Sequence, residues 1–173
     1  VKECGRVLGG GGVFEDGPTG RPYVANPTVE ELAQSLQVLG ALESLAGELA
    51  CVAATDAEIA EVSALCEQMN NAPEAFDPLE YFKLDMAFHR KIIVAARNAP
   101  LIATHAQYNA RLWRARFISS KRRGGRNSAL GQHIDIIDAL RRRDATETAR
   151  QMRRHLETTV VHITAAYENA EQR

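Results

Sequence analysis

Leucines spaced three and four residues apart dominate the chain after residue 27. A spacing of three and four places side chains on one face of an α-helix. The series is Leu32, Leu36, Leu39, Leu42, Leu45 and Leu49. Thr28, followed three residues later by Glu31, forms a capping-box pattern that starts a helix. The sequence therefore predicts one long amphipathic helix beginning at residue 28.

Five further segments repeat this apolar spacing. We expect these helices to start at Asp56, Pro78, Asn98, Ser128 and Asp144, which are common N-terminal residues of helices. The second helix should end near Asn71 and the third near Ala96, and residues 121–126 should form a basic joint. Six amphipathic helices with short joints predict an all-α fold, an antiparallel bundle of about six helices.

The first 27 residues differ in character from the rest. The four glycines of residues 9–12 exclude a helix interior, and residues 13–15 read as a short strand. Turn residues 16–20 and a second strand at 21–24 complete a small β-hairpin. We therefore divide the chain into residues 1–27, a remnant of another domain with its linker, and residues 28–173, the helical domain.

Charge and cysteine content narrow the classes of function. The formal net charge of −1 gives no overall attraction to nucleic acid or to an anionic membrane. The longest apolar runs are expected to fall short of a membrane span. Cys4, Cys51 and Cys66 lack the spacing of a metal or redox motif, which fits reduced thiols in the cytoplasm.

The third predicted helix carries polar residues on its apolar face. Asp85 and His89 share helical spacing with Phe82, Ile92 and Ala96. Because Asp85 and His89 are four residues apart, their side chains lie one turn apart and can converge on one point. An unpaired buried carboxylate is costly, so either a metal ion or a local hydrogen bond between the two is expected.

Two later helices each bring a histidine to an apolar face, His133 on the fifth and His155 on the sixth. Together with Asp85 and His89 they make three imidazoles and one carboxylate, a ligand set for zinc, nickel, manganese or iron. The alternative is that each is a core histidine with a satisfied hydrogen bond. His105 and His162 are assigned to structural or surface roles.

Several motifs occur in one order along the helical region. They are Leu42-Glu43-Ser44-Leu45-Ala46, Leu84-Asp85-Met86-Ala87-Phe88-His89, Ala95-Ala96-Arg97-Asn98, His133-Ile134-Asp135-Ile136-Ile137-Asp138-Ala139-Leu140, and Asp144 followed by Ala149-Arg150-Gln151-Met152-Arg153-Arg154-His155. This order resembles the C-terminal effector domain of GntR transcription regulators of the FadR type, known as the FCD domain. The resemblance covers about residues 28–165.

The resemblance implies a dimeric helical bundle in a cytoplasmic, non-enzymatic regulator. In the metal-binding branch of the family, an Asp and three His coordinate a divalent cation, and the matching residues here are Asp85, His89, His133 and His155. Zinc is the first expectation, with nickel, manganese or iron as alternatives. One departure is Gln132, because the family often has Glu directly before the third ligand.

The resemblance also interprets the first 27 residues. GntR regulators carry a winged-helix DNA-binding domain before the effector domain, and the predicted hairpin resembles its wing. Operator DNA is therefore the expected partner of the full-length protein. The recognition helix is not identifiable in this chain, so no DNA-binding residue is assigned.

The expected effector is a small organic acid whose carboxylate replaces water on the metal. Arginines of the fourth helix would bind the rest of the effector: Arg111, Arg114 and Arg116, of which Arg111 is favoured because it follows Tyr108 by three. Tyr108 and Trp113 could line the pocket. The alternative assigns the arginines to solvent and the two aromatic residues to the core.

Two other classes of function remain open. A metalloenzyme could use three His and one Asp to activate water, although the sequence shows neither a general-base motif nor a nucleophile elbow. A structural metal site in a dimerisation module would be indifferent to small acids. In the favoured interpretation, effector binding changes the arrangement of a dimer and thereby the affinity for DNA.

Overall fold

The structure is a computed structural model that describes residues 14–16, 22–24, 27–121 and 125–171. Within these ranges the helices are α2 (Val29–Ala53), α3 (Asp56–Asn71), α4 (Pro78–Ala95), α5 (Ala99–Ser120), α6 (Gly125–Arg141) and α7 (Ala145–Glu171). The expected all-α bundle of six helices is confirmed for this part of the chain.

Local sequence signals set most of the helix starts. Thr28 and Glu31 form the expected capping box of α2, in which the Glu31 backbone N–H donates to Thr28 Oγ1 at 3.2 Å. The Asn98 side chain accepts from the Leu101 backbone N–H at 3.1 Å and caps α5. At α7, Asp144 Oδ1 accepts from the Glu147 backbone N–H at 3.0 Å. These caps satisfy N–H groups that have no partner within the helix.

Helix α3 begins at the expected Asp56, but its N-cap and the start of α6 differ from the prediction. The N-cap of α3 is Thr55, which forms a second capping box with Glu58, so Asp56 lies in the first turn instead. The Thr55 hydroxyl accepts from the Glu58 backbone N–H while the Glu58 carboxylate accepts from the Thr55 backbone N–H, so the pair satisfies two backbone donors. Helix α6 begins at Gly125, three residues before Ser128. A glycine costs little at a helix start, where its N–H needs no partner within the helix.

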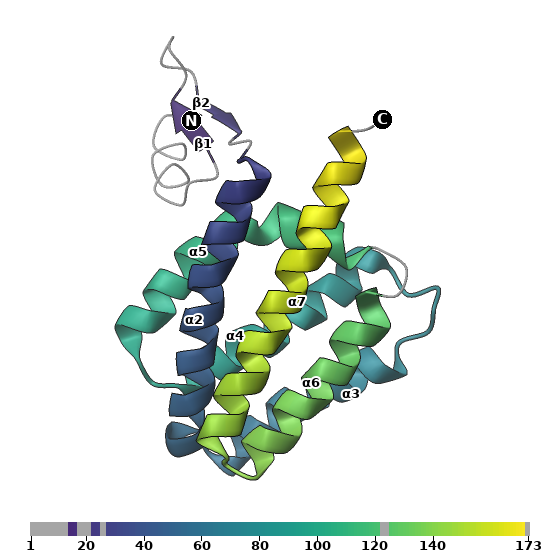
Figure 1. Cartoon of the computed structure of the whole chain (residues 1–173). Helices are drawn as coiled ribbons and strands as arrows, with labels where there is room; N and C mark the ends of the chain where they lie inside the picture. The colour runs from purple at the N-terminus through teal and green to yellow at the C-terminus, as the bar shows by residue number, and fades with distance from the viewer. Residues whose placement is uncertain (1–13, 17–21, 25–26, 122–124, 172–173) are drawn as a thin grey trace.

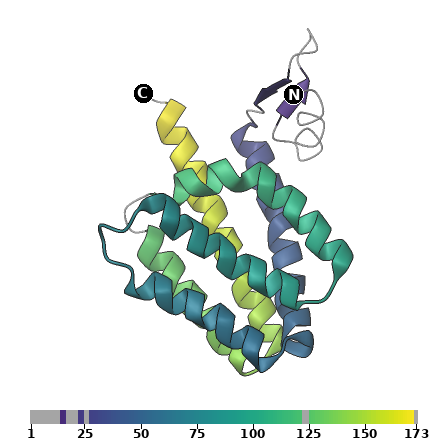
Figure 2. The same ribbon diagram turned by 180° about the vertical axis from the view of Figure 1, so that it is seen from behind.

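The helices form two layers. Helices α6, α7 and α2 lie side by side in one layer (Figure 1), and α3, α4 and α5 cover it from behind (Figure 2). The most extensive helix–helix interface is between α2 and α7, which run in opposite directions. Because α4 packs against α2 and α3 against α6, the inner faces of both layers enclose a common interior.

Glycines permit the close approach of α2 and α7. A Cβ placed on Gly47 would lie 3.0 Å from Thr148 Cγ2 and 3.1 Å from Met152 Cγ. A Cβ on Gly40 would lie 3.3 Å from Leu156 Cβ. Such distances are shorter than ordinary carbon contacts, so the small residue sets the separation of the two helices.

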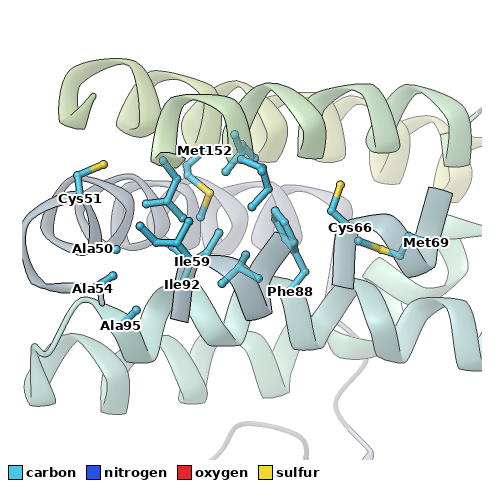
Figure 3. Packing of buried hydrophobic residues seen from close by; sticks show 14 of the residues in the cluster. Ala50, Cys51, Ala54, Ile59, Cys66, Met69, Phe88, Ile92, Ala95 and Met152 are labelled. Carbon is cyan, nitrogen blue, oxygen red and sulfur yellow. The ribbon is translucent and has the colours of Figure 1, made fainter. Parts of the chain in front are cut away.

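The largest apolar cluster fills the space between the layers. Phe88 and Ile92 of α4 meet Ile59 and Met69 of α3 and Met152 of α7 (Figure 3). All five are at least 94% buried. Burial of this kind fixes the rotation of α4 about its axis, which in turn determines where Asp85 and His89 point.

The apolar residues with helical spacing are buried in the main, but three of them, Leu45, Ile118 and Ile134, are 43%, 38% and 43% exposed. Helix α2 is also long and apolar enough to cross a membrane by length and composition, which the sequence argument did not expect. Half of its most apolar stretch is buried inside the bundle, as in a core helix.

Strands β1 (Phe14–Asp16) and β2 (Pro22–Val24) precede the bundle. They pair antiparallel, with Phe14 opposite Val24 and Asp16 opposite Pro22. The glycine run at residues 9–12 and the turn at 17–20 lie outside the described residues. The interpretation of this segment as a wing remains a prediction.

Candidate metal and effector site

The four predicted ligand residues converge inside the bundle. Asp85 and His89 come from α4, His133 from α6 and His155 from α7. One ligand atom from each lies within 4.8 Å of the others. The sequence argument placed these residues on inward faces, and the packing of the two layers brings the faces together.

The imidazoles form a tight, buried group. The ring centroid of His155 is 4.9 Å from that of His89 and 4.7 Å from that of His133. Asp85 Oδ1 lies 3.1 Å from His133 Nε2 and 3.8 Å from His89 Nε2. All three histidines are buried, whereas the Asp85 side chain is 16% exposed.

The residues fit a metal because several buried ring nitrogens lie near carboxylate oxygens without forming an aligned hydrogen bond. Both ring nitrogens of His89 and of His133 are buried and have no aligned hydrogen-bond partner. Buried polar atoms normally have a partner, and leaving one without costs free energy. A divalent cation would bind such lone pairs, and three imidazoles with one carboxylate are suitable donors for it.

Gln132 orients the third imidazole. Its Oε1 lies 2.9 Å from His155 Nδ1, and its Nε2 donates to Thr158 Oγ1 at 2.9 Å. Since the amide oxygen can only accept, His155 carries its proton on Nδ1. The lone pair of its Nε2 is then available to a metal, as in many sites where a second residue fixes the tautomer.

The electrostatics of the group favour the protonation states that a metal requires. Burial lowers the pKa of His133, against the opposing effect of Asp85. Burial, together with His133 and His89, lowers the pKa of His155 well below its ordinary value. Burial raises the pKa of Asp85, but the contact with His133 and the charges of His89 and Arg116 outweigh it and hold the pKa low. Neutral imidazoles of His133 and His155 and an ionised Asp85 carboxylate follow.

Glu43 is a member of this site that the sequence argument missed. Its carboxylate is 0% exposed in the middle of α2. Its Oε2 lies 2.7 Å from His89 Nδ1, and its Oε1 lies 3.1 Å from His105 Nε2 and 3.6 Å from an Arg116 guanidinium nitrogen. Burial raises the pKa of Glu43, but His89, His105 and Arg116 outweigh it and hold the pKa well below its ordinary range. A signal existed, because Glu43 follows buried Leu39 by four residues.

A pocket opens beside the metal group. Its lining includes Asp85, His155 and Arg116, with Ser119 and Thr159 as further polar groups. Arg116 is only 4% exposed, and its Nη1 donates to Asn109 Oδ1 at 2.9 Å. The pocket therefore offers a buried guanidinium and hydroxyl groups next to the predicted metal ligands, which suits an anionic ligand.

The other predicted effector residues lie elsewhere. The Arg111 side chain is exposed and stacks over the Tyr108 ring at 5.8 Å. Tyr108 packs against the apolar cluster of α2, α5 and α7. Trp113 is 40% exposed and makes an edge contact with Phe82 at 5.2 Å. None of the three lines the pocket described above, whereas Arg116 does.

His162 and His105, assigned from sequence to structural or surface roles, both lie close to the candidate site. His162 lines the pocket, and His105 is buried against Glu43. His105 keeps a structural role in the polar network. His162 lies one turn beyond Thr159 on α7, and both residues line the pocket.

Comparison with known proteins places this arrangement in a family. The sequence pattern of the FCD domain matches residues 34–158. The chain belongs to the FCD domain family. The resemblance to FCD-containing regulators of the GntR family is thereby confirmed. The matched region contains Glu43, Arg116 and the four predicted metal ligands.

Two solved structures share the fold of this FCD domain. McbR/YncC of E. coli matches with a TM-score of 0.84 at 16% sequence identity, covering 96% of this chain and 79% of that one. GntR of Streptococcus agalactiae matches with a TM-score of 0.63 at 18% identity, covering 92% and 79%. A comparison with curated protein sequences gave no significant match. At such identities the structural likeness establishes the fold.

Proposed function

We propose that this FCD domain is a metal-dependent sensor of a small carboxylic acid in a transcription regulator. The observation that carries the proposal is the convergence of Asp85, His89, His133 and His155, two of whose imidazoles have no aligned partner for either nitrogen. A divalent metal bound there, zinc first and otherwise nickel, manganese or iron, would supply open coordination positions for an anionic oxygen.

The chain's own residues give the pocket its selectivity. Arg116 presents a buried guanidinium whose planar N–H groups match a carboxylate better than an ammonium group would. Ser119 and Thr159 offer hydroxyl groups for polar substituents of the ligand. Arg111, Tyr108 and Trp113, proposed from the sequence, would act only from outside this pocket, so Arg116 is now the favoured effector contact.

The proposal extends to the regulator as a whole. The segment of β1 and β2 would be part of the wing of a winged-helix domain, through which the full-length cytoplasmic protein binds operator DNA. The FCD domain would form a homodimer, and effector binding would shift the dimer between arrangements that differ in the spacing of the DNA-binding domains. No catalytic residues are proposed.

Thermal unfolding tests this function directly. The protein is stripped with a chelator and heated with zinc alone, with a panel of small mono- and dicarboxylic acids alone, and with both. A ligand that binds only the native state raises the melting temperature, so at least one acid should add a shift in the presence of zinc and none in its absence. A shift with zinc but with no acid would indicate a structural metal site instead.

A further inference from the structure

Glu43 occupies a position where a carboxylate is hard to accommodate. It lies in the middle of α2 with no solvent exposure, between the apolar cluster of Leu36 and Leu39 and that of Ala46. A buried charge is costly unless it is paired and hydrogen-bonded. Glu43 Oε1 is hydrogen-bonded to His105 of α5 and lies near Arg116 of the same helix, and its Oε2 lies against His89 of α4 without an aligned hydrogen bond.

The position of Glu43 distinguishes the two nitrogens of the His89 ring. Nδ1 lies 2.7 Å from Glu43 Oε2, whereas Nε2 lies 3.8 Å from Asp85 Oδ1. The two nitrogens therefore face two different carboxylates. A proton on Nδ1 would be attracted to Glu43 and would leave the lone pair of Nε2 on the side of Asp85. A carboxylate behind a ligating imidazole fixes its tautomer and raises its basicity.

The contact with Arg116 connects the same carboxylate to the pocket. Glu43 Oε1 lies 3.6 Å from Arg116 Nη1, and that nitrogen also donates to Asn109 Oδ1. The Arg116 side chain lines the pocket together with Asp85 and His155. A single buried carboxylate therefore neighbours one predicted metal ligand and the predicted anion-binding group.

We propose that Glu43 is a positioning residue of this site, which holds His89 with Nε2 toward the metal and Arg116 toward the pocket. The inference rests on the proposed metal-binding function. It adds that metal affinity and effector affinity depend on one carboxylate that contacts neither ligand. A Gln at this position would set its NH₂ group against one of the surrounding donors, because it has one acceptor oxygen where Glu43 has two.

The test measures Co²⁺ binding to the full chain, by visible absorption, for wild type, Glu43→Gln, Glu43→Asp and Ser44→Ala. Ser44 is the matched control, since it is buried on the same helix and its hydroxyl donates to the Ala149 carbonyl at 3.0 Å, away from the site. Glu43→Gln should weaken Co²⁺ binding about 10- to 100-fold and shift the absorption bands. Glu43→Asp, which keeps the charge on a shorter side chain, should fall between Glu43→Gln and wild type.

Outcomes separate this inference from the proposed function. If wild type binds no Co²⁺, the metal-binding function fails and Glu43 loses its role with it. If wild type binds Co²⁺ and Glu43→Gln has the same affinity and spectrum, only the positioning role is overturned. An equal loss in Ser44→Ala would also overturn it, because the effect would then come from the packing of α2.

A measurement on wild type keeps the inference testable if Glu43→Gln does not fold. Long-range ¹H–¹⁵N NMR distinguishes the two histidine tautomers in the metal-free protein. His89 should carry its proton on Nδ1. A proton on Nε2 would contradict the proposed role, whatever the variants do.

Discussion

Replacing Gln132 tests whether the hydrogen bond between Gln132 and His155 supports metal binding. In Gln132→Ala, His155 Nδ1 loses the acceptor that now lies 2.9 Å away. Thr158 is not left without a partner, because its hydroxyl also donates to the Arg154 carbonyl at 3.0 Å. The variant therefore isolates the loss at His155.

The expected loss of metal affinity follows from that single hydrogen bond. A residue that orients a metal-bound histidine typically contributes 10- to 100-fold in affinity, which is about 1.4 to 2.7 kcal/mol. Gln132→Glu keeps the acceptor and adds a charge, and charge-assisted hydrogen bonds are roughly twice as strong as neutral ones. Metal affinity should therefore fall in Gln132→Ala and stay at or above the wild-type value in Gln132→Glu.

Zinc affinity is measured by competition with a chromophoric chelator at constant pH. Gln151→Ala serves as the control, because Gln151 is a buried glutamine of α7 whose Nε2 donates to Glu147, not to a predicted ligand. The reasoning is refuted if Gln132→Ala binds zinc as wild type does. An equal loss in Gln151→Ala would refute it too, since the effect would then arise from α7 as a whole.

Three further predictions concern the pocket, the helix packing and the pH dependence. Arg116→Lys should weaken binding of the active carboxylic acid roughly tenfold or more while zinc affinity stays within about twofold, because lysine keeps the charge but lacks the two parallel N–H donors of a guanidinium. Calorimetry with each ligand checks this, and an equal loss of zinc affinity would argue against it. Gly47→Ala should lower the free energy of unfolding by up to about 2 kcal/mol through overpacking against α7, even after the gain in helix propensity. Gly131→Ala has nothing within 4 Å of the new Cβ and should raise the free energy of unfolding by up to about 1 kcal/mol. Denaturant unfolding distinguishes the two variants, and equal effects would contradict the packing argument. Burial lowers the pKa of His133 and His155, so below about pH 6.5 the unfolded chain binds more protons than the folded one. The metal-free protein should therefore lose stability as pH falls through that value toward the lowered pKa values. Melting curves from pH 8 to 5 measure this, and a flat profile would be inconsistent with buried neutral imidazoles.

One half of the candidate metal group was predictable from sequence because its geometry is local. Asp85 and His89 are one helical turn apart, so any helix through these residues brings them together. His133 and His155 could be placed on inward faces from their apolar neighbours, but their convergence with Asp85 required the packing of three helices. The caps at Thr28, Asn98 and Asp144 are likewise set by a few adjacent residues.

The remaining parts depended on tertiary packing. Glu43 reads from sequence as one polar residue in a leucine-rich helix, and its partners come from α4 and α5. The choice between Arg111 and Arg116 depends on the rotation of α5, which the burial of Leu112 and Ala115 sets. Arg116 follows Leu112 by four residues and therefore shares its inward face, whereas Arg111 does not.

The metal content of the purified protein tests the central claim most directly. Wild type and Asp85→Ala are expressed and purified without chelators, and their divalent metals are quantified by elemental analysis. The account predicts about one divalent metal ion per wild-type chain and much less in Asp85→Ala, with both proteins equally helical by circular dichroism. No metal in wild type, or the same amount in Asp85→Ala, would contradict it.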